Sequence, residues 1–544
     1  MEIIQGKGVA EGIVSGRIHS VKPVHRPVPI KENTDPETEL KNFREACAVL
    51  TAELIELSKK AKETVGEKEA EIFDIHRMML EDEGFIDPTE ARITAGESAA
   101  SAVIASGEEL ALLFSSMNDP YMQAREADIK SIAERLCQIL TGTEPVSLTA
   151  DTPVILAAED LTPAQTIELN PHTILGFVTE KGNSNSHTAI LARMLNIPAV
   201  AAVGALPDSI EGKNAILDGG NGILYIEPDD EIRSHYEIVK TQKMQLKETL
   251  EKLRGVACET KDGKRIYIYA NAGNLTDVDS AVLGDAEGIG LFRSEFLFMQ
   301  YDRCPTEEEQ LAVYCTVLKK MPEKEVIIRT LDAGADKQIP WLQRDIHEEN
   351  PALGLRAIRL CLQNPRLLYT QLRALYRASF HGKIRALIPM ITLSEELDQV
   401  HRIAENVRNG LAAEKIPFDP DMPIGIMIET PAAALMAGTL AERADFFSLG
   451  TNDLTQYAMA ADRENASVSY LTENLPEAVK KLIRMTADAA LNAGIPVSIC
   501  GELASDMQAI PFLLETGINK FSVSPGQVLK VRDRVSRILS GENS

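Results

Sequence analysis

Apolar residues recur at helical spacing over a long stretch near the start of the chain. From Leu40 to Ala61 they follow one another at alternating steps of three and four, a heptad-like seam that predicts a long amphipathic helix. Pro36 near its start and Gly66 near its end frame this helix. Further amphipathic stretches follow at residues 70–80, 98–114 and 121–140, and they are separated by Gly84, Pro88 and Pro120. The pattern predicts a small bundle of antiparallel helices joined by short connections.

Strand-like patterns flank this predicted bundle on both sides. Residues 3–21 alternate glycine with β-branched residues, which is typical of short strands and turns. After Gly142, apolar runs alternate with turn and helix signals at residues 153–157, 173–178, 199–202 and 215–218. This alternation indicates an α/β domain. The simplest interpretation is that residues 1–22 and 146–226 form one α/β domain, and that residues 23–145 are a helical insertion within it.

The last part of the chain contains eight strand-like runs separated by helical stretches. The runs are nearly all apolar, as expected for parallel strands with both faces covered. They are residues 265–270, 288–292, 325–329, 384–389, 424–428, 446–449, 497–500 and 520–523. Eight such units predict a (β/α)8 barrel of the TIM type over residues 258–544. A charged helical stretch before it predicts a linker helix within 227–257, or else a solvated surface helix of the barrel.

The composition narrows the classes of function. The chain of 544 residues has a net charge of −25, which disfavours nucleic acid or an anionic membrane as a main partner and suits a basic protein partner. Its seven cysteines are scattered and lack CxxC spacing, which indicates reduced thiols rather than disulfides or a zinc site. The sequence shows neither a signal peptide nor a membrane-spanning stretch. We therefore expect a multidomain α/β protein of the cytoplasm.

Polar residues stand directly after the predicted barrel strands, where the active sites of such barrels lie. They are Asn271, Arg293, Arg329, Glu429, Asn452, Asp453, Cys500 and Glu502. Arg293 and Arg329, together with Arg463, suit a small, highly charged anion, because guanidinium groups bind phosphate and carboxylate bidentately. Glu429 and Asp453 match a hard, oxygen-ligated ion such as Mg²⁺. Cys500 is either a buried core thiol or a proton donor.

A loop of small polar residues leads into an apolar helical stretch at Gly182–Arg193, and His187 stands where the loop becomes helix. A helix N-terminus binds anions, because its N–H groups are unpaired and its dipole favours negative charge. From the loop alone, His187 is either a helix cap or a phosphoryl acceptor. The predicted anion and metal groups of the barrel favour the acceptor, since phosphoryl transfer needs mainly positioning and charge neutralisation.

Long segments of the chain resemble the enzyme I family, the phosphoenolpyruvate–protein phosphotransferases of the bacterial sugar phosphotransferase system. The stretch from Asp445 to Tyr457, continuing to Asp462-Arg463, is similar to the signature of this family. Further close matches lie at residues 295–299, 350–359, 428–433 and 500–504. The resemblance covers essentially the whole chain, with the domains in the same order.

The resemblance implies a role for each candidate residue. His187 would carry the phosphoryl group, and Cys500 would protonate the enolate to give pyruvate. The residues implied for binding phosphoenolpyruvate are Arg293, Arg329, Asn452, Asp453 and Arg463. Glu429 and Asp453 would ligate Mg²⁺, and Thr162 would hydrogen-bond the active histidine. The implied supporting residues are Arg193, Arg356 and Glu502.

The resemblance also implies partners. The helical insertion would dock HPr or an HPr-like carrier protein through residues 67–80, and the basic docking face of HPr suits the acidic chain. The barrel would form a homodimer. A hinge near residues 227–230 and Gly255 would carry the histidine domain between the barrel and the carrier.

Two segments depart from the pattern of the family. Asn183, Ser184 and Asn185 precede Ser186 where the family usually has Gly-Arg-Thr, and Ala335 stands where the family usually has glycine. Asn183 suits a positive φ better than Ala335 does. The lost arginine removes a positive charge near the histidine, so a changed rate or partner preference is expected.

Two alternatives to an active enzyme I remain. One is a non-catalytic or altered-partner regulatory paralogue, which would bind HPr or phosphoenolpyruvate without turnover. The other is a relative of phosphoenolpyruvate synthase or pyruvate phosphate dikinase. Those enzymes need a large nucleotide-binding domain before the histidine domain, and here only residues 1–145 precede it.

Overall fold

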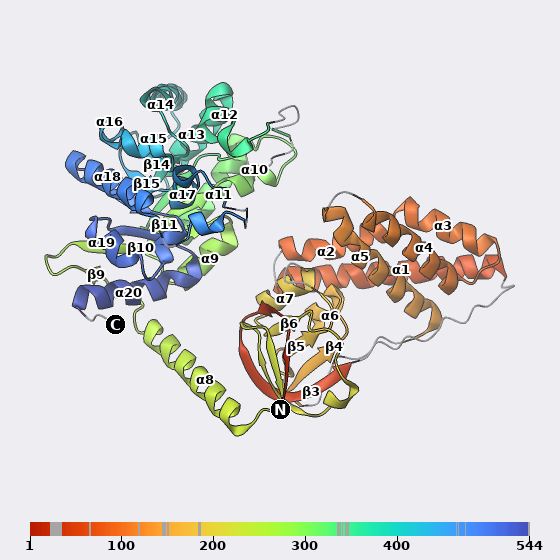
Figure 1. Ribbon diagram of the computed structural model, residues 1–544. Helices are drawn as coiled ribbons and strands as arrows, with labels where there is room; N and C mark the ends of the chain where they lie inside the picture. Colours follow the sequence, from red (N-terminus) through yellow and green to blue (C-terminus); the bar gives the residue numbers. More distant parts are fainter. Residues whose placement is uncertain are drawn as a thin grey trace. The chain divides into compact units, whose positions relative to one another are not determined.

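The computed structural model in Figure 1 describes residues 1–21, 35–64, 67–117, 120–143, 148, 152–182, 186–334, 339, 341–342, 348–463, 465, 467–473 and 475–541. The chain forms two compact units, residues 1–244 and 245–544. Within the described residues, no helix combines the length and the apolar character needed to cross a membrane.

The described residues of the first unit contain an eight-stranded sheet of order β1-β8-β7-β3-β4-β5-β6-β2. Its strands are β1 Glu2–Gln5, β2 Lys7–Ala10, β3 Ile13–Val21, β4 Val154–Ala158, β5 Ile174–Thr179, β6 Ala199–Ala201, β7 Asn214–Asp218 and β8 Ile223–Ile226. Strand β3 pairs in parallel with β4 and antiparallel with β7, so strands from both sides of the helical stretch share one sheet. Strand β8 was not predicted from the sequence, because it is a run of only four residues.

Helices come between β3 and β4 in the chain and pack around their own apolar core, which includes Phe43, Phe73 and Phe85. They are α1 Pro36–Thr64, α2 Glu67–Leu80, α3 Glu83–Thr94, α4 Ala99–Ser115 and α5 Pro120–Thr141. Helix α3 was not predicted from the sequence, because Gly84 and Pro88 resemble breaks between helices. Asp82 caps this helix by accepting a hydrogen bond from the Gly84 N–H at 2.8 Å, and Pro88 removes only one backbone donor.

The rest of the first unit carries short helices beside the sheet and one long helix at its end. They are α6 Pro163–Glu168, α7 His187–Met194, the 3₁₀ helix η1 Asp208–Ile210 and α8 Asp230–Glu251. Helix α8 continues into the second unit, and of its residues only Tyr236 is buried. The Tyr236 hydroxyl donates to Asp218 at 2.9 Å, which fixes the start of α8 to the first unit.

The second unit is the predicted barrel, and the (β/α)8 prediction is confirmed. Its strands are β9 Cys258–Glu259, β10 Arg265–Ala272, β11 Gly288–Arg293, β12 Glu325–Arg329, β13 Ile384–Ile388, β14 Ile424–Ile428, β15 Phe447–Leu449, β16 Val497–Ile499 and β17 Lys520–Val523. Strands β10 to β17 pair in parallel, and β10 closes the ring by pairing with both β11 and β17. Strand β9 pairs antiparallel with the start of β10.

Helices surround these strands in Figure 1. They are α9 Leu275–Leu283, α10 Glu295–Met299, α11 Glu307–Lys320, α12 Ala357–Gln363, α13 Pro365–Ser379, α14 Ser394–Glu414, α15 Pro431–Leu435, α16 Ala437–Ala441, α17 Thr451–Met459, α18 Glu477–Ala493, α19 Ile510–Glu515 and α20 Val528–Ser540, with 3₁₀ turns η2 Pro351–Leu353, η3 Ser469–Leu471, η4 Glu502–Ser505 and η5 Pro525–Gln527. Both faces of the strands are therefore buried, which explains their apolar composition.

Charged and apolar layers fill the barrel from its N-terminal end. There Glu325 pairs with Lys520 and with Arg385, both at 2.6 Å. The next layer, towards the C-terminal ends of the strands, is apolar and consists of Leu291, Ile327, Leu387, Met427, Phe446 and Cys500. The interior is thus a packed core, and the C-terminal ends of the strands are left to hold a site.

The helical core of the first unit contains one buried ionic group. Asp128 on α5 accepts from Arg125 at 2.8 Å and lies 3.2 Å from the His76 ring of α2, and all three residues are buried. Burial would raise the pKa of Asp128, but hydrogen bonds and charge attraction from His76 and Arg125 outweigh it and lower the pKa. Asp128 therefore joins α2 to α5 as a charged carboxylate.

We expect Asp128→Asn to destabilise the first unit by about 3–5 kcal/mol at neutral pH, because it leaves buried charge without a partner. The pKa of Asp128 is lowered on folding, so its contribution is present above the unfolded value of about 3.9 and is lost as the pH falls through the folded value. Urea unfolding from about pH 7 to about pH 2 should show a difference from wild type that stays constant down to about pH 4 and shrinks below it.

Glu126→Gln is the matched control, since Glu126 forms an exposed pair with Lys130 on the same helix. It should change the free energy of unfolding by less than about 0.5 kcal/mol. An Asp128→Asn protein as stable as this control would contradict the assignment.

Candidate active site

The strand ends bring the predicted barrel residues to one rim. Arg293 and Arg329 are the last residues of β11 and β12, Glu429 follows β14 and Cys500 follows β16. Asn452 and Asp453 lie in the first turn of α17, directly after β15, and Arg463 follows that helix. Because β11 to β16 run in parallel, these residues lie at the same end of the barrel.

A buried carboxylate that the sequence analysis did not select as a site residue organises this rim. Asp332 lies 3.0 Å from the Arg329 guanidinium and 2.9 Å from that of Arg356. Arg329 also donates to Glu295 at 2.5 Å. The exposed fractions of Arg329, Asp332 and Arg356 are 5%, 1% and 3%. Buried charges require such pairing, so each side chain in this array is fixed in direction by the others.

Asp453 extends the array towards the solvent. It lies 3.4 Å from Arg356 and 3.8 Å from Arg463. Arg463 and Arg293 are exposed, whereas Arg329 and Arg356 are held by the carboxylates of the protein. The rim thus has two buried, oriented guanidinium groups and two exposed ones that a ligand can reach.

Tyr457 on α17 supports Arg356 from a further side. Its hydroxyl accepts from Arg356 at 3.0 Å and donates to the Ala352 carbonyl at 2.5 Å. Behind Arg356, Gly334 has a φ of +122°, and a Cβ there would come within 2.4 Å of the Arg356 Cβ. Only glycine suits both demands. Residues 335–338 follow it, so the departure at Ala335 lies outside the described residues.

Glu429 is a buried carboxylate with too little positive charge around it. Its Oε1 accepts from the Met390 N–H at 2.6 Å. Burial raises the pKa of Glu429 to about 8, and the charges of Asp453 and Asp332 add to the effect, while Arg329 and Arg356 oppose it. A cation beside Glu429 and Asp453 would relieve this repulsion, so the pair suits a divalent metal ion.

The described residues contain no group of three or more His, Cys, Asp or Glu side chains placed to hold a metal ion. Two carboxylates alone would leave most of the coordination sphere to water and to ligand oxygens. Mg²⁺ is commonly bound in this way, through one or two carboxylates and the phosphate of a substrate.

Cys500 is a buried thiol at the same rim. Its Sγ donates to the Leu449 carbonyl at 3.4 Å, and burial raises its pKa to about 11. The thiol therefore keeps its proton at neutral pH. The neighbouring Gly501 allows this strand end to pack against α17, because a Cβ there would come within 1.9 Å of the Thr451 hydroxyl oxygen.

Asn452 and Glu502 join the chain after β15 to the chain after β16, which carries Cys500. The Asn452 amide donates to the Glu502 carboxylate at 3.1 Å, and its oxygen accepts from the Glu502 N–H at 3.0 Å. Asn271 donates to the Cys500 carbonyl at 3.1 Å. These contacts hold the backbone that carries the thiol.

In the first unit, His187 begins α7, so loop becomes helix where the sequence predicts. Ser186 caps the helix by accepting from the Ala189 N–H at 3.2 Å. The side chain of His187 and the departures at Asn183, Ser184 and Asn185 lie outside the described residues. The role of His187 therefore stays a prediction.

The start of α7 is tied to the segment that contains Thr162. The Thr188 hydroxyl donates to the Leu161 carbonyl at 2.6 Å, and the Thr162 side chain caps α6 by accepting from the Gln165 N–H at 3.2 Å. Arg193 donates to the Val9 carbonyl at 3.0 Å and so holds α7 to β2. Thr162 thus has a structural role as a helix cap, and its predicted bond to the histidine stays a prediction.

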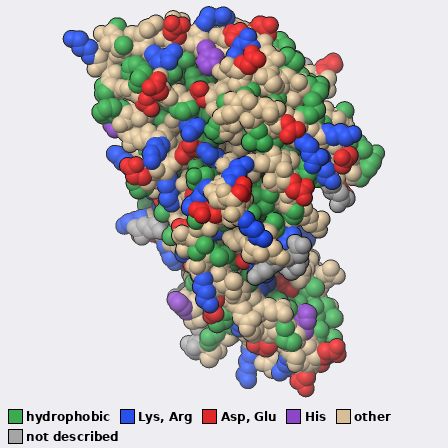
Figure 2. Space-filling model, turned by 90° about the vertical axis from the view of Figure 1, so that its left-hand side faces the viewer, with side chains coloured by type: hydrophobic (Ala, Val, Ile, Leu, Met, Phe, Trp, Pro, Cys, Tyr) green, Lys and Arg blue, Asp and Glu red, His purple; other side chains and the backbone are tan. Residues whose placement is uncertain are grey.

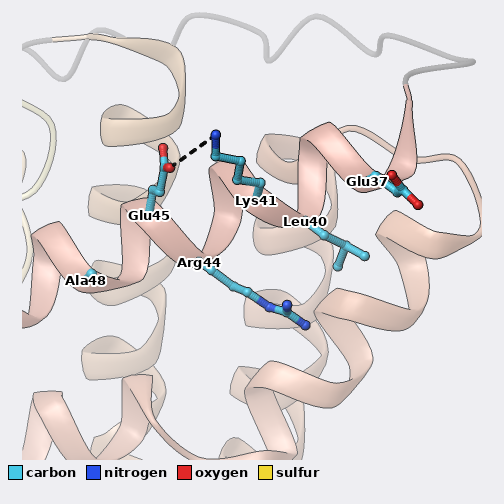
Figure 3. A pocket seen from close by; sticks show the side chains of 6 residues that line it. All are labelled: Glu37, Leu40, Lys41, Arg44, Glu45 and Ala48. Atoms are coloured by element: carbon cyan, nitrogen blue, oxygen red, sulfur yellow. Dashed lines mark ion pairs between the residues drawn. The ribbon is translucent and has the colours of Figure 1, made fainter.

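A surface hollow of about 450 Å³ lies elsewhere, on α1, and contains none of the predicted site residues. It is lined by Glu37, Leu40, Lys41, Arg44, Glu45 and Ala48 (Figure 3). Lys41 and Glu45 form an ion pair of 3.8 Å at its edge, and Arg44 pairs with Glu90 at 2.9 Å. Because a single helix lines it, the hollow lacks converging side chains.

Comparison with known families agrees with this geometry. Three family models match the chain: the N-terminal domain of PEP-utilising enzymes at residues 5–125, their mobile domain at 150–222 and their PEP-binding domain at 247–540. A phosphoenolpyruvate-protein phosphotransferase of Listeria innocua is 38% identical over 99% of this chain and 95% of its own length. The chain belongs to the phosphoenolpyruvate-protein phosphotransferase family of PEP-utilising enzymes.

Two further comparisons show a second relative of similar identity and a solved structure of lower identity. The phosphoenolpyruvate-protein phosphotransferase of Bacillus subtilis is 38% identical over 100% of this chain and 95% of its own length. A solution structure of an Enzyme I protein is 30% identical and covers 44% of this chain and 99% of that chain, with a TM-score of 0.39. The three family models and the two curated relatives confirm the resemblance drawn from the sequence.

We expect Glu429→Gln to stabilise the metal-free protein at alkaline pH. The pKa of Glu429 is about 8 in the folded protein, against about 4.3 in an unfolded chain, so the free energy of unfolding falls as the pH rises between these values. Glutamine keeps an acceptor for Met390 and removes this titration. Thermal unfolding in the presence of a chelator should show the midpoint of the variant rising relative to that of wild type between about pH 5 and about pH 8.5.

Glu405→Gln on the exposed face of α14 is the control and should follow the wild type at every pH. If the difference between Glu429→Gln and wild type does not change with pH, Glu429 is not the strained carboxylate described above.

Proposed function

We propose that the protein is a phosphoenolpyruvate–protein phosphotransferase. It moves the phosphoryl group of phosphoenolpyruvate to His187 and then to a histidine of HPr or an HPr-like carrier, and it releases pyruvate. This is the first step of sugar uptake by group translocation. The observation that carries the proposal is the buried Arg329–Asp332–Arg356 array beside Glu429 and Asp453 at the barrel rim.

The exposed and buried arginines share the work of binding. Arg293 and Arg463, which are exposed, close on the phosphate and carboxylate of phosphoenolpyruvate, while the pre-oriented Arg329 supplies a guanidinium that needs no reorganisation. Asn452 adds an amide to the same ligand. Because Asn452 also bonds Glu502, binding is coupled to the strand end that carries Cys500.

Glu429 and Asp453 are the residues that hold Mg²⁺ in this proposal. When bound, the ion neutralises charge on the phosphate and polarises its oxygens. The raised pKa of Glu429 supports this role, because a carboxylate repelled by its neighbours gains from a cation.

The reaction breaks the bond between phosphorus and the bridging oxygen of phosphoenolpyruvate. A ring nitrogen of His187 forms the new bond to phosphorus, and the bonding electron pair leaves with the enolate of pyruvate. The Cys500 thiol then gives its proton to the methylene carbon of the enolate, which yields pyruvate, and solvent returns a proton to the sulfur. A pKa of about 11 supports this role, since the thiol is protonated at neutral pH.

The proposed domains follow the sequence boundaries. Residues 1–22 and 146–226 carry the phosphohistidine, residues 23–145 bind HPr, residues 227–257 link, and residues 258–544 bind phosphoenolpyruvate and form a homodimer. The protein would act in the cytoplasm.

On the face in Figure 2, acidic and basic side chains are interspersed, so the net charge of −25 is not gathered on that face.

His187 must reach the barrel rim and then the carrier, so the proposal needs a hinge beside the linker helix. Two hydrogen bonds anchor α8. Tyr236, near its start, bonds to Asp218, and beyond its end the Leu253 carbonyl accepts from Arg532 at 3.0 Å. The exposed part of α8 between these two anchors is therefore a further candidate position for the hinge.

Incubation with radiolabelled phosphoenolpyruvate and Mg²⁺ tests the function. We expect an acid-labile, alkali-stable phosphoprotein that forms without ATP and passes its label to HPr. His187→Ala should remove the label, whereas the control His172→Ala, which changes an exposed histidine of the same unit, should keep it.

An unlabelled wild type, or equal label on wild type and His187→Ala, would overturn the proposal. Tight binding of phosphoenolpyruvate without label or pyruvate release would instead favour the regulatory paralogue.

A further inference from the structure

Behind the rim lies a connected group of buried, uncharged polar side chains that no step above uses. Ser294 follows β11, Gln310 and Tyr314 lie on α11, and Gln371 lies on α13. None of the four is more than 1% exposed. Polar groups are removed from water at a cost, so such a group is kept only where its hydrogen bonds are satisfied.

Gln371 is the centre of this group, because its amide makes three hydrogen bonds. Its Nε2 donates to the Ser294 hydroxyl at 3.0 Å and to the Tyr314 hydroxyl at 3.1 Å, and its Oε1 accepts from the Leu331 N–H at 2.9 Å. Both N–H donors and the oxygen are therefore used, which fixes the orientation of the amide.

These bonds hold the backbone on both sides of Thr330. Ser294 passes the contact on by donating to the Arg329 carbonyl at 2.7 Å, while Gln371 itself holds the Leu331 N–H. Arg329 is thus held at its own carbonyl, and Asp332 is the residue directly after Leu331. A glutamine of the outer helical layer thus fixes the chain that carries them.

The same contacts also fix the end of β11. Ser294 stands between Arg293, an exposed arginine of the rim, and Glu295, which pairs with Arg329. Gln371 therefore bridges the ends of two neighbouring strands, and each strand presents an arginine to the rim. Strand pairing places Arg293 opposite Arg329, and the bridge holds the backbone directly after both residues.

The outer members keep the group neutral and rigid. Tyr314 donates to the Gln310 oxygen at 3.4 Å, and Gln310 donates to the Pro305 carbonyl at 3.0 Å. Burial raises the pKa of the Tyr314 phenol, and the charge of Glu295 raises it further, so the hydroxyl keeps its proton.

We propose that Gln371 is a positioning residue for phosphoenolpyruvate, which holds the strand ends that present Arg293 and Arg329 without touching the ligand. The inference rests on the proposed function and adds the residue that determines its binding geometry. A misplacement of about 1 Å in such a site costs about 100-fold in rate.

The first test uses Gln371→Met, which keeps the length of the side chain and removes its three hydrogen bonds. We expect kcat/KM for phosphorylation by phosphoenolpyruvate to fall by about 10- to 100-fold. The control is Thr486→Val on α18, which removes a buried hydroxyl bond to the Leu482 carbonyl at 2.9 Å. The control should lower kcat/KM by less than about twofold at a similar loss of thermal stability.

Gln371→Glu separates positioning from packing. The protonated acid has one donor and one acceptor, so it replaces most of the amide contacts, whereas the carboxylate cannot donate at all. Burial near Glu295 would raise the pKa of the new carboxyl group. At low pH we expect Gln371→Glu to have a kcat/KM near that of wild type. As the pH rises, its kcat/KM should fall, and this decrease should be absent from the pH profiles of wild type and Gln371→Met.

Tyr314→Phe is the milder variant if Gln371→Met fails to fold, and a loss of about three- to tenfold is expected because one of the three bonds is removed. Equal kcat/KM for Gln371→Met and Thr486→Val, or a Gln371→Glu profile parallel to the wild type, overturns the positioning role while wild-type activity upholds the function. A wild type without activity overturns the proposed function itself.

Discussion

The rim of the barrel depends on one buried carboxylate shared by two guanidinium groups. Asp332 pairs with Arg329 and Arg356 where water has little access, so none of the three can turn away without leaving a charge unpaired. The glycine at 334 allows the approach of Arg356, and Gln371 fixes the backbone between Arg329 and Asp332. The site is therefore oriented before any ligand arrives, as electrostatic catalysis requires.

The same burial has different consequences for two groups at the rim. It raises the pKa of Cys500, which keeps a proton available for an enolate. It also raises the pKa of Glu429, which makes the metal-free site strained at neutral pH and better suited to a cation. The metal-free protein is thus less stable because of charges at its binding site, where a bound metal ion would reduce the repulsion.

Most of the fold could be predicted from the sequence because its signals are local. Each barrel strand is a short apolar run, and the C-terminal strand ends follow from these runs by a general rule of the fold. Helix α3 was missed because Gly84 and Pro88 are poor helix formers taken alone, and the cap from Asp82 outweighs them.

The candidate site was predicted less completely, for a physical reason that differs between residues. Asp332 and Glu295 follow their strands closely enough for the strand-end rule to have found them. Gln371 gives no such signal, since it lies in the middle of an outer helix and reaches the rim only through tertiary packing. The sequence of the loop before His187 departs from that of the family, and its pattern of residue types does not predict how this changes the reactivity of His187.

We propose that the Asp332 array orients the groups that bind phosphoenolpyruvate. Titration calorimetry of His187→Ala with phosphoenolpyruvate and Mg²⁺ measures this binding without turnover. Adding Asp332→Asn should weaken the affinity by about 100-fold, because Arg329 and Arg356 are then no longer held in the direction that suits the ligand. Adding Asp279→Asn, which changes an exposed partner of Lys320, should leave it unchanged. An Asp332→Asn protein that binds as tightly as this control would contradict the account.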